Sequence, residues 1–410
     1  MRRSLVLLAL LLAGCTTQPT AQPAAAPTAQ PAAVERATAA PAATIAPAAA
    51  PVPSAPPPPA DAALNPSPAA PSLAALPAPI YFMDAKRHIA RIERDVSTTT
   101  LPAIVPPAPA DVDSFVELAA APDGRSLAFT ASAVGLTIID AGGAQRAVFP
   151  GSVESPAWHP DSASVAARWT DGPAGPGVYR FPIDGGAPAL LQPDTAPTAD
   201  SPGLSLAPLS YAPDGATLLL STSIADADFC GIALHPLGAP NIIPIAMPGG
   251  LTSCSAAVWT ADGQGIILTQ QSAGAMAALL PGLWRASTAT GAVTPFADES
   301  LGDTAALYAY FASSGQGLLG FRALVPTYDP LEVRAAPFPL QMVRVGADGT
   351  SAVLPPEERS FAFATWAPDG SGALVWDEQT ADSSARYVPA DGAPAVPLPT
   401  IRWPAVWGRP

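Results

Sequence analysis

Six segments of the chain repeat one pattern of hydrophobic and polar positions. In each, a short apolar stretch leads into a tight polar turn, and a second, largely apolar run follows. The segments read AAAPDGRSLAFTAS, AWHPDSASVAARWT, SYAPDGATLLLSTS, VWTADGQGIILTQQ, YFASSGQGLLGFRA and TWAPDGSGALVWDE. Spacings of 38 to 55 residues between the turns, with several short strands in each unit, are typical of β-propeller blades.

The turn of each unit has residues suited to a hairpin. Proline sets φ for an early turn position, aspartate accepts a hydrogen bond from a nearby backbone N–H, and glycine adopts positive φ without steric cost. The recurring position holds Asp123, Asp161, Asp214, Asp262, Ser314 and Asp369. A structural turn is needed in every blade, whereas a catalytic or metal site is needed only once. We therefore interpret these aspartates as turn residues.

An aromatic residue recurs three positions before the turn residue in five of the six units. The residues at this position are Ala120, Trp158, Tyr211, Trp259, Phe311 and Trp366. Smaller residues stand two positions earlier, and this alternation fits an inner strand that lines the channel on one side and packs on the other. Because the aromatic position recurs, we predict that it forms the core between blades rather than a stacking platform for a ligand.

The two ends of the repeat region complement each other. Near the C-terminus Trp407 matches Trp366, and the chain stops at Pro410, where the next turn aspartate would stand. At the other end, three strands are predicted without an inner strand before them, at about 80–84, 88–94 and 98–105. We expect the C-terminal strand to complete the first of seven four-stranded antiparallel blades, which removes exposed sheet edges. The predicted fold class is therefore all-β.

The six Pro-Asp-Gly-like turns resemble the TolB-type β-propeller repeats of bacterial secreted proteins, which also occur in propellers attached to some serine peptidases. The resemblance covers residues 79–410 and implies a propeller fold. The fifth of the six motifs departs from it with Ser-Ser-Gly in place of Pro-Asp-Gly. TolB itself resembles a six-bladed propeller with an extra amino-terminal domain, neither of which this chain predicts, so the partners of TolB are not carried over.

The first residues have the features of an export signal. Two arginines precede an apolar run from Leu5 to Ala13, which is shorter than the roughly 20 residues of a membrane-spanning helix. The stretch Leu12-Ala13-Gly14-Cys15 resembles the bacterial lipobox. That resemblance implies removal of residues 1–14 as a lipoprotein signal peptide and acylation of Cys15, hence an extracytoplasmic protein anchored to a bacterial membrane. The alternative is an ordinary signal peptide with a chance cysteine.

Residues 15–78 form the lipidated N-terminus and a predicted disordered linker. Of the 63 residues from Thr16 to Ala78, 16 are proline, and no aromatic residue occurs before Tyr81. Such a segment cannot bury enough apolar surface to offset the entropy of ordering it. Proline favours extended polyproline II at about 3.1 Å per residue, so the linker could reach roughly 200 Å.

The charge of the chain excludes one class of ligand, and its cysteine content predicts a disulfide. Residues 79–410 carry 16 Lys and Arg against 31 Asp and Glu, a net charge of −15, which repels phosphates and excludes nucleic-acid binding. Cys230 and Cys254 remain once Cys15 is acylated, an even pair in an oxidising compartment. We predict a disulfide between them; two buried thiols are the alternative.

The connections at one face of the predicted ring are short hairpins, and those at the other face are longer and irregular. Because variable loops on a rigid scaffold tend to carry function, we expect a binding face there for a basic protein partner or a cation. Solvation of an acidic protein would produce the same carboxylates. The candidate residues are Asp226, Asp228, Asp298, Glu299, Tyr328, Asp329, Glu332 and Arg334.

Motifs for catalysis are absent from the sequence. The three histidines, His88, His159 and His235, have no zinc-ligand spacing, and there is no Gly-x-Ser-x-Gly elbow and no phosphate-binding loop. The segment 226–229 lacks the ligand density of a calcium loop, so no metal or cofactor is predicted. We expect a non-catalytic binding or scaffolding module whose partner is another protein. The alternatives are a hydrolase or lyase of glycans or peptides acting at the channel mouth, and a sensor domain.

Overall fold

The computed structural model of the chain describes most of the predicted propeller. It describes residues 76–107, 116–132, 134–198, 202–224, 230–247, 257–269, 283–297, 300–301, 304–314, 317–325, 340–346, 351–354, 363–376, 385–399 and 401–409. The predicted signal peptide, Cys15 and nearly all of the predicted linker lie outside these residues. Within the described part of the chain, no helix has the length and apolar character needed to span a bilayer.

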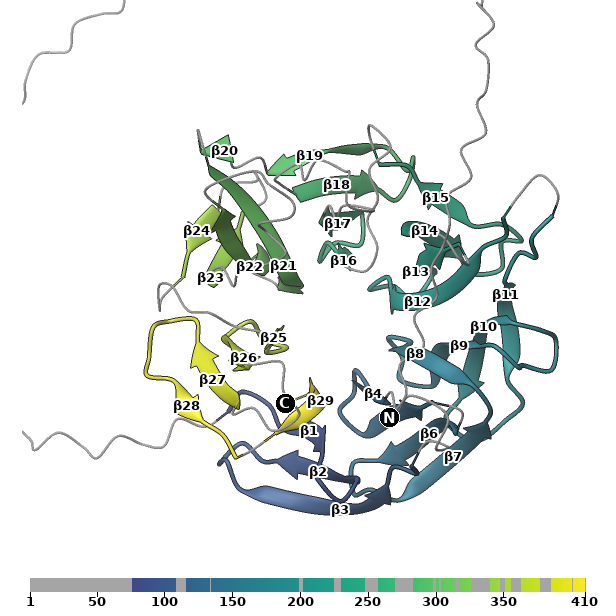
Figure 1. The fold of residues 1–410 in the computed structure, drawn as a ribbon, viewed down its shortest axis with the longest axis horizontal. Coiled ribbons are helices and arrows are strands. Elements are labelled where there is room, and N and C mark those ends of the chain that lie inside the picture. Colours follow the sequence, from purple (N-terminus) through teal and green to yellow (C-terminus); the bar gives the residue numbers. More distant parts are fainter. Residues whose placement is uncertain are drawn as a thin grey trace, which may run out of the picture. The chain divides into compact units, whose positions relative to one another are not determined.

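Seven antiparallel sheets are formed by the described residues, and they lie around a common centre as the blades of a propeller (Figure 1). The prediction of a seven-bladed all-β propeller is confirmed. The first blade has the strand order β29 (Arg402–Trp407), β1 (Ile80–Met83), β2 (His88–Ile92) and β3 (Thr98–Ile104). The second consists of β4 (Val116–Ala120), β5 (Ser126–Ala131), β6 (Gly135–Asp140) and β7 (Gln145–Pro150).

The third and fourth blades follow in the same way. The third contains β8 (Val153–Trp158), β9 (Ser164–Trp169), β10 (Gly177–Pro182) and β11 (Ala189–Pro193). The fourth contains β12 (Ser205–Tyr211), β13 (Thr217–Ser223), β14 (Cys230–Pro236) and β15 (Ile243–Ile245). In each, the first strand in sequence lies innermost (Figure 1).

The last three blades complete the ring, and one of them has an additional short strand. The fifth contains β16 (Ala257–Trp259), β17 (Gly265–Thr269), β18 (Leu283–Ser287) and β19 (Val293–Ala297). The sixth contains β20 (Ser300–Leu301), β21 (Thr304–Ser314), β22 (Gly317–Val325), β23 (Leu340–Val345) and β24 (Ser351–Val353). The seventh contains β25 (Phe363–Trp366), β26 (Gly372–Trp376), β27 (Ala385–Pro389) and β28 (Val396–Pro397). The two-residue β20 makes the sixth sheet five-stranded.

The first blade joins the two ends of the repeat region, as the sequence predicts. β29 pairs antiparallel with β1, with Ile80 opposite Trp407 and Phe82 opposite Ala405. Beyond the strand, the Gly408 N–H donates to the Pro79 carbonyl over 2.7 Å. Packing begins slightly before residue 79, because the side chain of Leu76 is fully buried beside this blade. The closure removes the two free sheet edges that an open ring would expose.

Seven apolar clusters lie between neighbouring blades, and the second strand of each blade contributes to two of them. In β13, Leu218 packs toward the third blade and Leu219 toward the fifth. In β17, Ile266 and Ile267 divide in the same way between the fourth and sixth blades. Successive side chains of a strand point to opposite faces, so a strand with neighbouring blades on both sides has apolar residues at consecutive positions.

The recurring aromatic residues whose side chains the structure describes occupy the predicted core between blades. Trp158, Trp259 and Trp407 are buried, and each donates an indole hydrogen bond to the inner strand of the preceding blade. The acceptors are the carbonyls of Ala119 at 2.8 Å, Ser210 at 3.4 Å and Thr365 at 3.1 Å, each directly before the matching position of its own blade. The repeat therefore encodes a polar contact as well as an apolar one.

The turn aspartates form the hairpins that their recurrence predicts. Asp123 and Asp214 each accept a hydrogen bond from the backbone N–H two residues later, at 2.9 Å. The residue directly after each of these aspartates has positive φ, for example +69° at Gly124. The third blade has Ser162 at this position with φ of +61°, and its hydroxyl accepts a hydrogen bond from the Asp123 N–H of the neighbouring turn at 3.0 Å.

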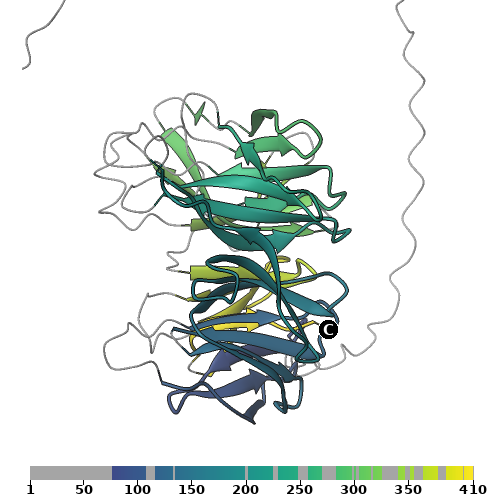
Figure 2. The ribbon, with the colours of Figure 1, turned by 90° about the vertical axis from the view of Figure 1, so that its right-hand side faces the viewer.

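Strands of each blade run between two opposite faces of the ring (Figure 2). We call the face with the aspartate hairpins the turn face. The opposite face is the loop face. It carries connections such as 170–176, between the second and third strands of the third blade, and 194–204, between the third and fourth blades.

Candidate functional site

The residues that the sequence singles out for binding are not tested by the structure. Asp226, Asp228, Asp298, Glu299, Tyr328, Asp329, Glu332 and Arg334 lie outside the described residues. So does Cys254, and of Cys230 only the backbone is described, as the first residue of β14. The acidic face and the disulfide therefore stay predictions.

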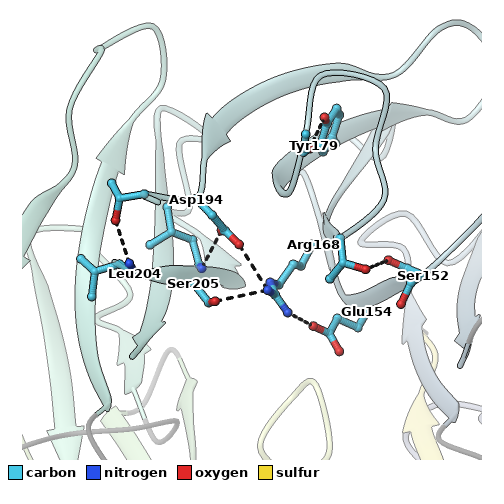
Figure 3. Close-up of polar contacts among 11 residues, drawn as sticks. Ser152, Glu154, Arg168, Tyr179, Asp194, Leu204 and Ser205 are labelled. Carbon is cyan, nitrogen blue, oxygen red and sulfur yellow. Dashed lines mark hydrogen bonds and ion pairs between the residues drawn. The ribbon is translucent and has the colours of Figure 1, made fainter. Parts of the chain in front are cut away.

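A different polar cluster lies at the loop face, where the third and fourth blades meet. Arg168, near the end of β9, is at its centre and donates from Nη1 to Glu154 Oε1 of β8 over 2.5 Å. Its Nη2 lies 3.2 Å from Asp194 Oδ2 and 3.3 Å from Ser205 Oγ (Figure 3). The arginine thus joins two strands of its own blade to the connection that leads into the next blade.

The carboxylates of this cluster differ in exposure. The side chain of Asp194 is 10% exposed and that of Glu154 is 45% exposed. Asp194 also accepts a hydrogen bond from the Leu206 N–H at 2.9 Å, which holds the start of β12 against the end of the third blade. Glu154 keeps an open side toward solvent, so it is the carboxylate that an incoming molecule could contact.

Glu117 extends the cluster toward the second blade. It lies on β4 and accepts hydrogen bonds from the Thr130 hydroxyl at 3.1 Å and from the Ser155 N–H. Ser155 has φ of +56°, and the pairing of β8 with β9 shifts register between Glu154 and Ala157. A non-glycine residue at positive φ is strained, and such strain persists where neighbouring contacts hold it. The Glu117 carboxylate is one of those contacts.

Burial and charge act on these groups in opposite directions. Burial raises the pKa of Glu117, and the nearby Glu154 charge adds to this, while the hydrogen bonds from Ser155 and Thr130 lower it; the net shift is upward. For Arg168, burial lowers the pKa, but the hydrogen bonds and charges of Glu154 and Asp194 outweigh it and raise the pKa. The arginine is therefore a permanent cation held between carboxylates.

A cavity of about 480 Å³ opens beside Arg168 and Asp194. One wall is the 170–176 loop, and the other is formed by residues 193–197 and 202–205 at the two ends of the connection into the fourth blade. The lining residues are Arg168, Ala174, Gly175, Pro176, Pro193, Asp194, Thr195, Ala196, Pro197, Pro202, Gly203, Leu204 and Ser205. The volume lies in the range of small-molecule and side-chain binding pockets.

Both walls are fixed by hydrogen bonds. The Tyr179 hydroxyl donates to the Gly175 carbonyl over 2.6 Å and accepts from the Ala174 N–H at 3.1 Å. Across the cavity, Thr195 and Leu204 form an isolated antiparallel bridge with two backbone bonds of 3.0 Å. The Asp194 N–H donates to the Pro176 carbonyl over 3.0 Å and joins the two walls. The cavity is thus formed before any ligand binds.

The turn face carries a second polar group, which joins the third and fourth blades. His159 Nδ1 lies 2.8 Å from Asp161 Oδ1, and Nε2 lies 3.3 Å from the Gly215 carbonyl of the next blade. Its ring packs edge-on against Tyr211 at 4.8 Å between centroids. Burial raises the pKa of Tyr211 to about 12. These contacts hold the turns of the third and fourth blades together.

The residues of the loop-face cluster are not among the candidates that the sequence analysis selects. Glu117, Glu154 and Arg168 lie within strands, where the pattern predicts packing. The one signal in the sequence is an arginine at the end of the apolar run SVAARW. Among the described residues, no group of three or more His, Cys, Asp or Glu side chains is placed to hold a metal ion.

Comparison with known proteins identifies relatives of the fold. No family model matches the chain, and no curated protein matches it in sequence. Prolyl oligopeptidase B from Galerina marginata superposes with a TM-score of 0.54 at 9% identity, over 80% of this chain and 49% of that one. One of two structurally analysed prolyl endopeptidases gives a TM-score of 0.52 at 12% identity, over 81% and 51%.

The chain spans about half the length of these two peptidases, and at such identity the likeness is one of fold alone. TolB from Acinetobacter baumannii is also among the similar structures, with a TM-score of 0.43 at 15% identity, over 80% of this chain and 82% of that one. A similarity of that degree adds no argument about this chain beyond the propeller already described.

Proposed function

We propose that this chain is a non-catalytic binding module whose loop face recognises a protein partner. The observation that carries the proposal is the cavity between the third and fourth blades, with both walls held by hydrogen bonds and the ion pair of Arg168 with Asp194 in its lining. A pre-formed cavity loses little conformational entropy on binding, which favours recognition.

We further propose that the module is a bacterial lipoprotein with a TolB-type propeller. The support is the sequence at the N-terminus: the lipobox-like residues before Cys15 and the proline-rich stretch to Ala78. Acyl chains on Cys15 would anchor the protein to a membrane on its extracytoplasmic side, and the linker would let the propeller reach a partner at a distance.

Photocrosslinking of the full chain tests the binding proposal. A benzophenone amino acid at Ala196, exposed on the cavity wall, is expected to give a discrete adduct with one protein in the native membrane fraction. The matched control carries the same probe at Ala393, which is exposed on the turn face beside the Asp391 hairpin. Adducts that are identical at both positions, or absent from Ala196, would contradict the proposal.

One observation favours a second candidate, a hydrolase or lyase of glycans or peptides. Glu117 and Glu154 are neighbouring carboxyl groups, and the pKa of Glu117 is raised, which is the relation that acid–base catalysis by two carboxyl groups requires. Against it, Glu117 accepts the Ser155 N–H at the backbone bulge and the hydroxyl of Thr130, its partner across the β4–β5 pair, and Arg168 is paired with Glu154. Release of sugar or peptide fragments from cell-envelope material, lost in Glu117→Gln and in Glu154→Gln, would favour the enzyme.

A further inference from the structure

We propose that the cavity between the third and fourth blades accepts an uncharged, apolar residue of the protein partner, whose backbone carbonyl oxygen accepts a hydrogen bond from Arg168 Nε. This inference rests on the proposed function and names the chemistry that the site selects. Three features of the described residues carry it: the paired charges of the lining, the hydrogen-bond donors that the lining leaves free, and the exposed proline rings of the walls.

The two charged residues among the described residues of the lining neutralise each other. Arg168 Nη2 lies 3.2 Å from Asp194 Oδ2, and Asp194 Oδ1 accepts the Leu206 N–H at 2.9 Å. A cationic ligand therefore finds no unpaired carboxylate in this lining, and an anionic ligand would have to displace Asp194 from Arg168. A charge brought into the cavity would lose hydration without gaining an opposite charge, which is costly. The site therefore favours an uncharged group.

The side chains of the lining have hydrogen-bond donors left to offer. Arg168 Nε is buried and has no hydrogen-bond partner among the described residues. The Ser205 hydroxyl accepts from Arg168 Nη2, and the Thr195 hydroxyl accepts from the Leu204 N–H. In the described part of the chain, neither hydroxyl proton has an acceptor. A buried donor without an acceptor costs free energy, so a ligand oxygen that accepts from Nε would recover that cost.

The free Nε–H lies on the edge of the guanidinium that faces the cavity lining. In this planar group, Nε–H and one N–H of Nη2 point in the same direction. The acceptors of Nη2 are Asp194 Oδ2 at 3.2 Å and Ser205 Oγ at 3.3 Å, and both residues line the cavity. These distances are long for hydrogen bonds, whereas Nη1 is 2.5 Å from Glu154 Oε1. The Nη2 edge is thus the loosely held one, and an oxygen that enters from the cavity has to move only this edge to reach Nε.

The walls suit an apolar residue rather than a sugar. Pro176, Pro193, Pro197 and Pro202 are exposed and line the cavity, together with Leu204 and several alanines and glycines. A proline ring is apolar, and its nitrogen has no hydrogen to donate. Each hydroxyl group of a sugar would need a partner that these rings do not provide. An apolar side chain that covers the rings is favoured by the apolar area that both remove from water.

NMR of the full chain with nitrogen-15-labelled arginine tests this inference. The probe is the blocked peptide acetyl-Ala-Ala-Leu-Ala-Ala-amide. We expect its addition to shift the Nε–H resonance of Arg168, which is assigned by its loss in Arg168→Lys. A peptide with sulfur in place of the leucine carbonyl oxygen is a weaker acceptor, so it should bind about fivefold more weakly and shift this resonance less.

Two charged peptides and a salt titration test the neutrality of the ligand. Peptides with lysine or glutamate in place of leucine should bind about tenfold more weakly, because each brings an unpaired charge into the cavity. Raising the salt concentration from 50 to 500 mM should change the affinity for the leucine peptide by less than about twofold, since salt screens interactions between charges.

Three variants locate the interaction. Arg168→Lys keeps a positive charge beside Asp194 and removes Nε, and it is expected to lower the affinity for the leucine peptide at least fivefold. Ala196→Trp places an indole at an exposed position of the cavity wall, where the fold tolerates it, and is expected to lower the affinity to a similar degree by filling the cavity. Ala393→Trp makes the same change at an exposed turn-face position and is expected to have no effect.

The other outcomes separate this inference from the proposed function. Equal or tighter binding of a charged peptide, or an Arg168 Nε–H resonance that does not move, would overturn the uncharged ligand, while a crosslinked adduct at Ala196 would still support the binding module. Unchanged affinity in Ala196→Trp would place the peptide outside the cavity and overturn the inference. Tighter binding of maltotriose than of the leucine peptide would overturn a protein residue in favour of a glycan. Absence of binding by every probe would also overturn the inference, and the crosslinking experiment alone would then decide the proposed function.

Discussion

Single residues at the loop face show how burial and neighbouring charge act on one carboxyl group. Glu117 accepts two hydrogen bonds that favour its ionised form, yet burial and Glu154 outweigh them and its pKa lies above the ordinary value of 4.5. The same carboxyl group holds Ser155 at positive φ. One side chain therefore links the shape of β8 to the charge of the loop-face cluster.

The raised pKa of Glu117 predicts a pH dependence of stability. A group whose pKa is higher in the folded state stabilises the fold below its unfolded pKa, and this contribution is lost as pH rises through the folded pKa. Wild type should therefore lose stability relative to Glu117→Gln as pH increases from about 4.5, because glutamine stays neutral. Denaturant unfolding of both proteins between pH 4 and 7.5 measures the difference. A difference that is constant across this range would contradict the prediction.

Glycine at position 215 is required for two separable reasons. Its φ is +74°, and a Cβ there would lie 2.6 Å from His159 Nε2 of the adjacent blade. Gly215→Ala is expected to cost about 1–2 kcal/mol for the left-handed backbone, and more because the His159 ring must move. The free energy of unfolding from denaturant titration is the measurement.

Gly238→Ala is the matched control for this substitution. Its φ is +85°, but no atom lies within 4 Å of the added Cβ, so only the backbone cost applies. Combining Gly215→Ala with His159→Ala should cost less than the sum of the single changes, since the clash is removed. Strict additivity, or equal losses at positions 215 and 238, would show that the contact with His159 has no energetic weight.

Elements of the ring depend on one another through the interblade clusters. Each second strand packs against two neighbouring blades, and each indole hydrogen bond crosses from one inner strand to the preceding one. β29 has a special place in this arrangement, because it supplies the inner strand of the first blade from the far end of the repeat region. Loss of that strand exposes β1 and removes Trp407 from the contact with the seventh blade.

Removal of residues 402–410 is expected to destabilise the whole propeller. The loss should exceed the roughly 3–5 kcal/mol that truncating one buried tryptophan costs, because strand pairing is lost as well. Thermal unfolding should shift to lower temperature and lose cooperativity. A synthetic peptide of residues 402–410 added in excess should recover part of the transition, and unchanged melting of the truncated chain would refute closure as a source of stability.

For the molecule as a whole, the proposed anchor would determine where the protein is located, and the acidic propeller would recognise the partner. A lipid on Cys15 would hold the chain at a membrane, and the residues from Thr16 to Ala78 would separate that membrane from the cavity. The propeller, with its net charge of −15, is itself repelled by anionic lipid surfaces. The lipid would then hold the chain at the membrane, while the linker and the negative charge would keep the propeller away from its surface.

Cys15→Ser is expected to abolish membrane association. Wild type made in a bacterial host should sediment with membranes and carry acyl mass on an amino-terminal Cys15, whereas the serine variant should appear in the soluble fraction. Fractionation and mass spectrometry of the amino terminus provide the measurement. Wild-type protein with a free thiol at Cys15, or a variant that still sediments with membranes, would remove the lipid anchor from the proposal.

The propeller, its seven blades and the closure by β29 could be predicted from the sequence. Each of these depends on a local pattern that most blades repeat: period-two alternation, a turn with aspartate and glycine, and an aromatic residue such as Trp158 or Trp366 three positions earlier. These rules act between residues that are close in sequence, so the sequence alone can reveal them. The hydrogen bond from each indole to the preceding blade could not be predicted in this way, because its acceptor is a backbone carbonyl of another unit.

The cavity and its ionic cluster were decided by the tertiary structure alone. Glu117, Glu154, Arg168 and Asp194 come from two blades and one connection, and along the chain Glu117 and Asp194 are 77 residues apart. Each residue occurs once, so no repeat marks it, and a carboxylate in a strand is indistinguishable in sequence from a solvated one. Only the winding of the blades around one centre brings Glu154 and Asp194 into ion pairs with Arg168, places Glu117 beside Ser155, and sets the two walls of the cavity opposite each other.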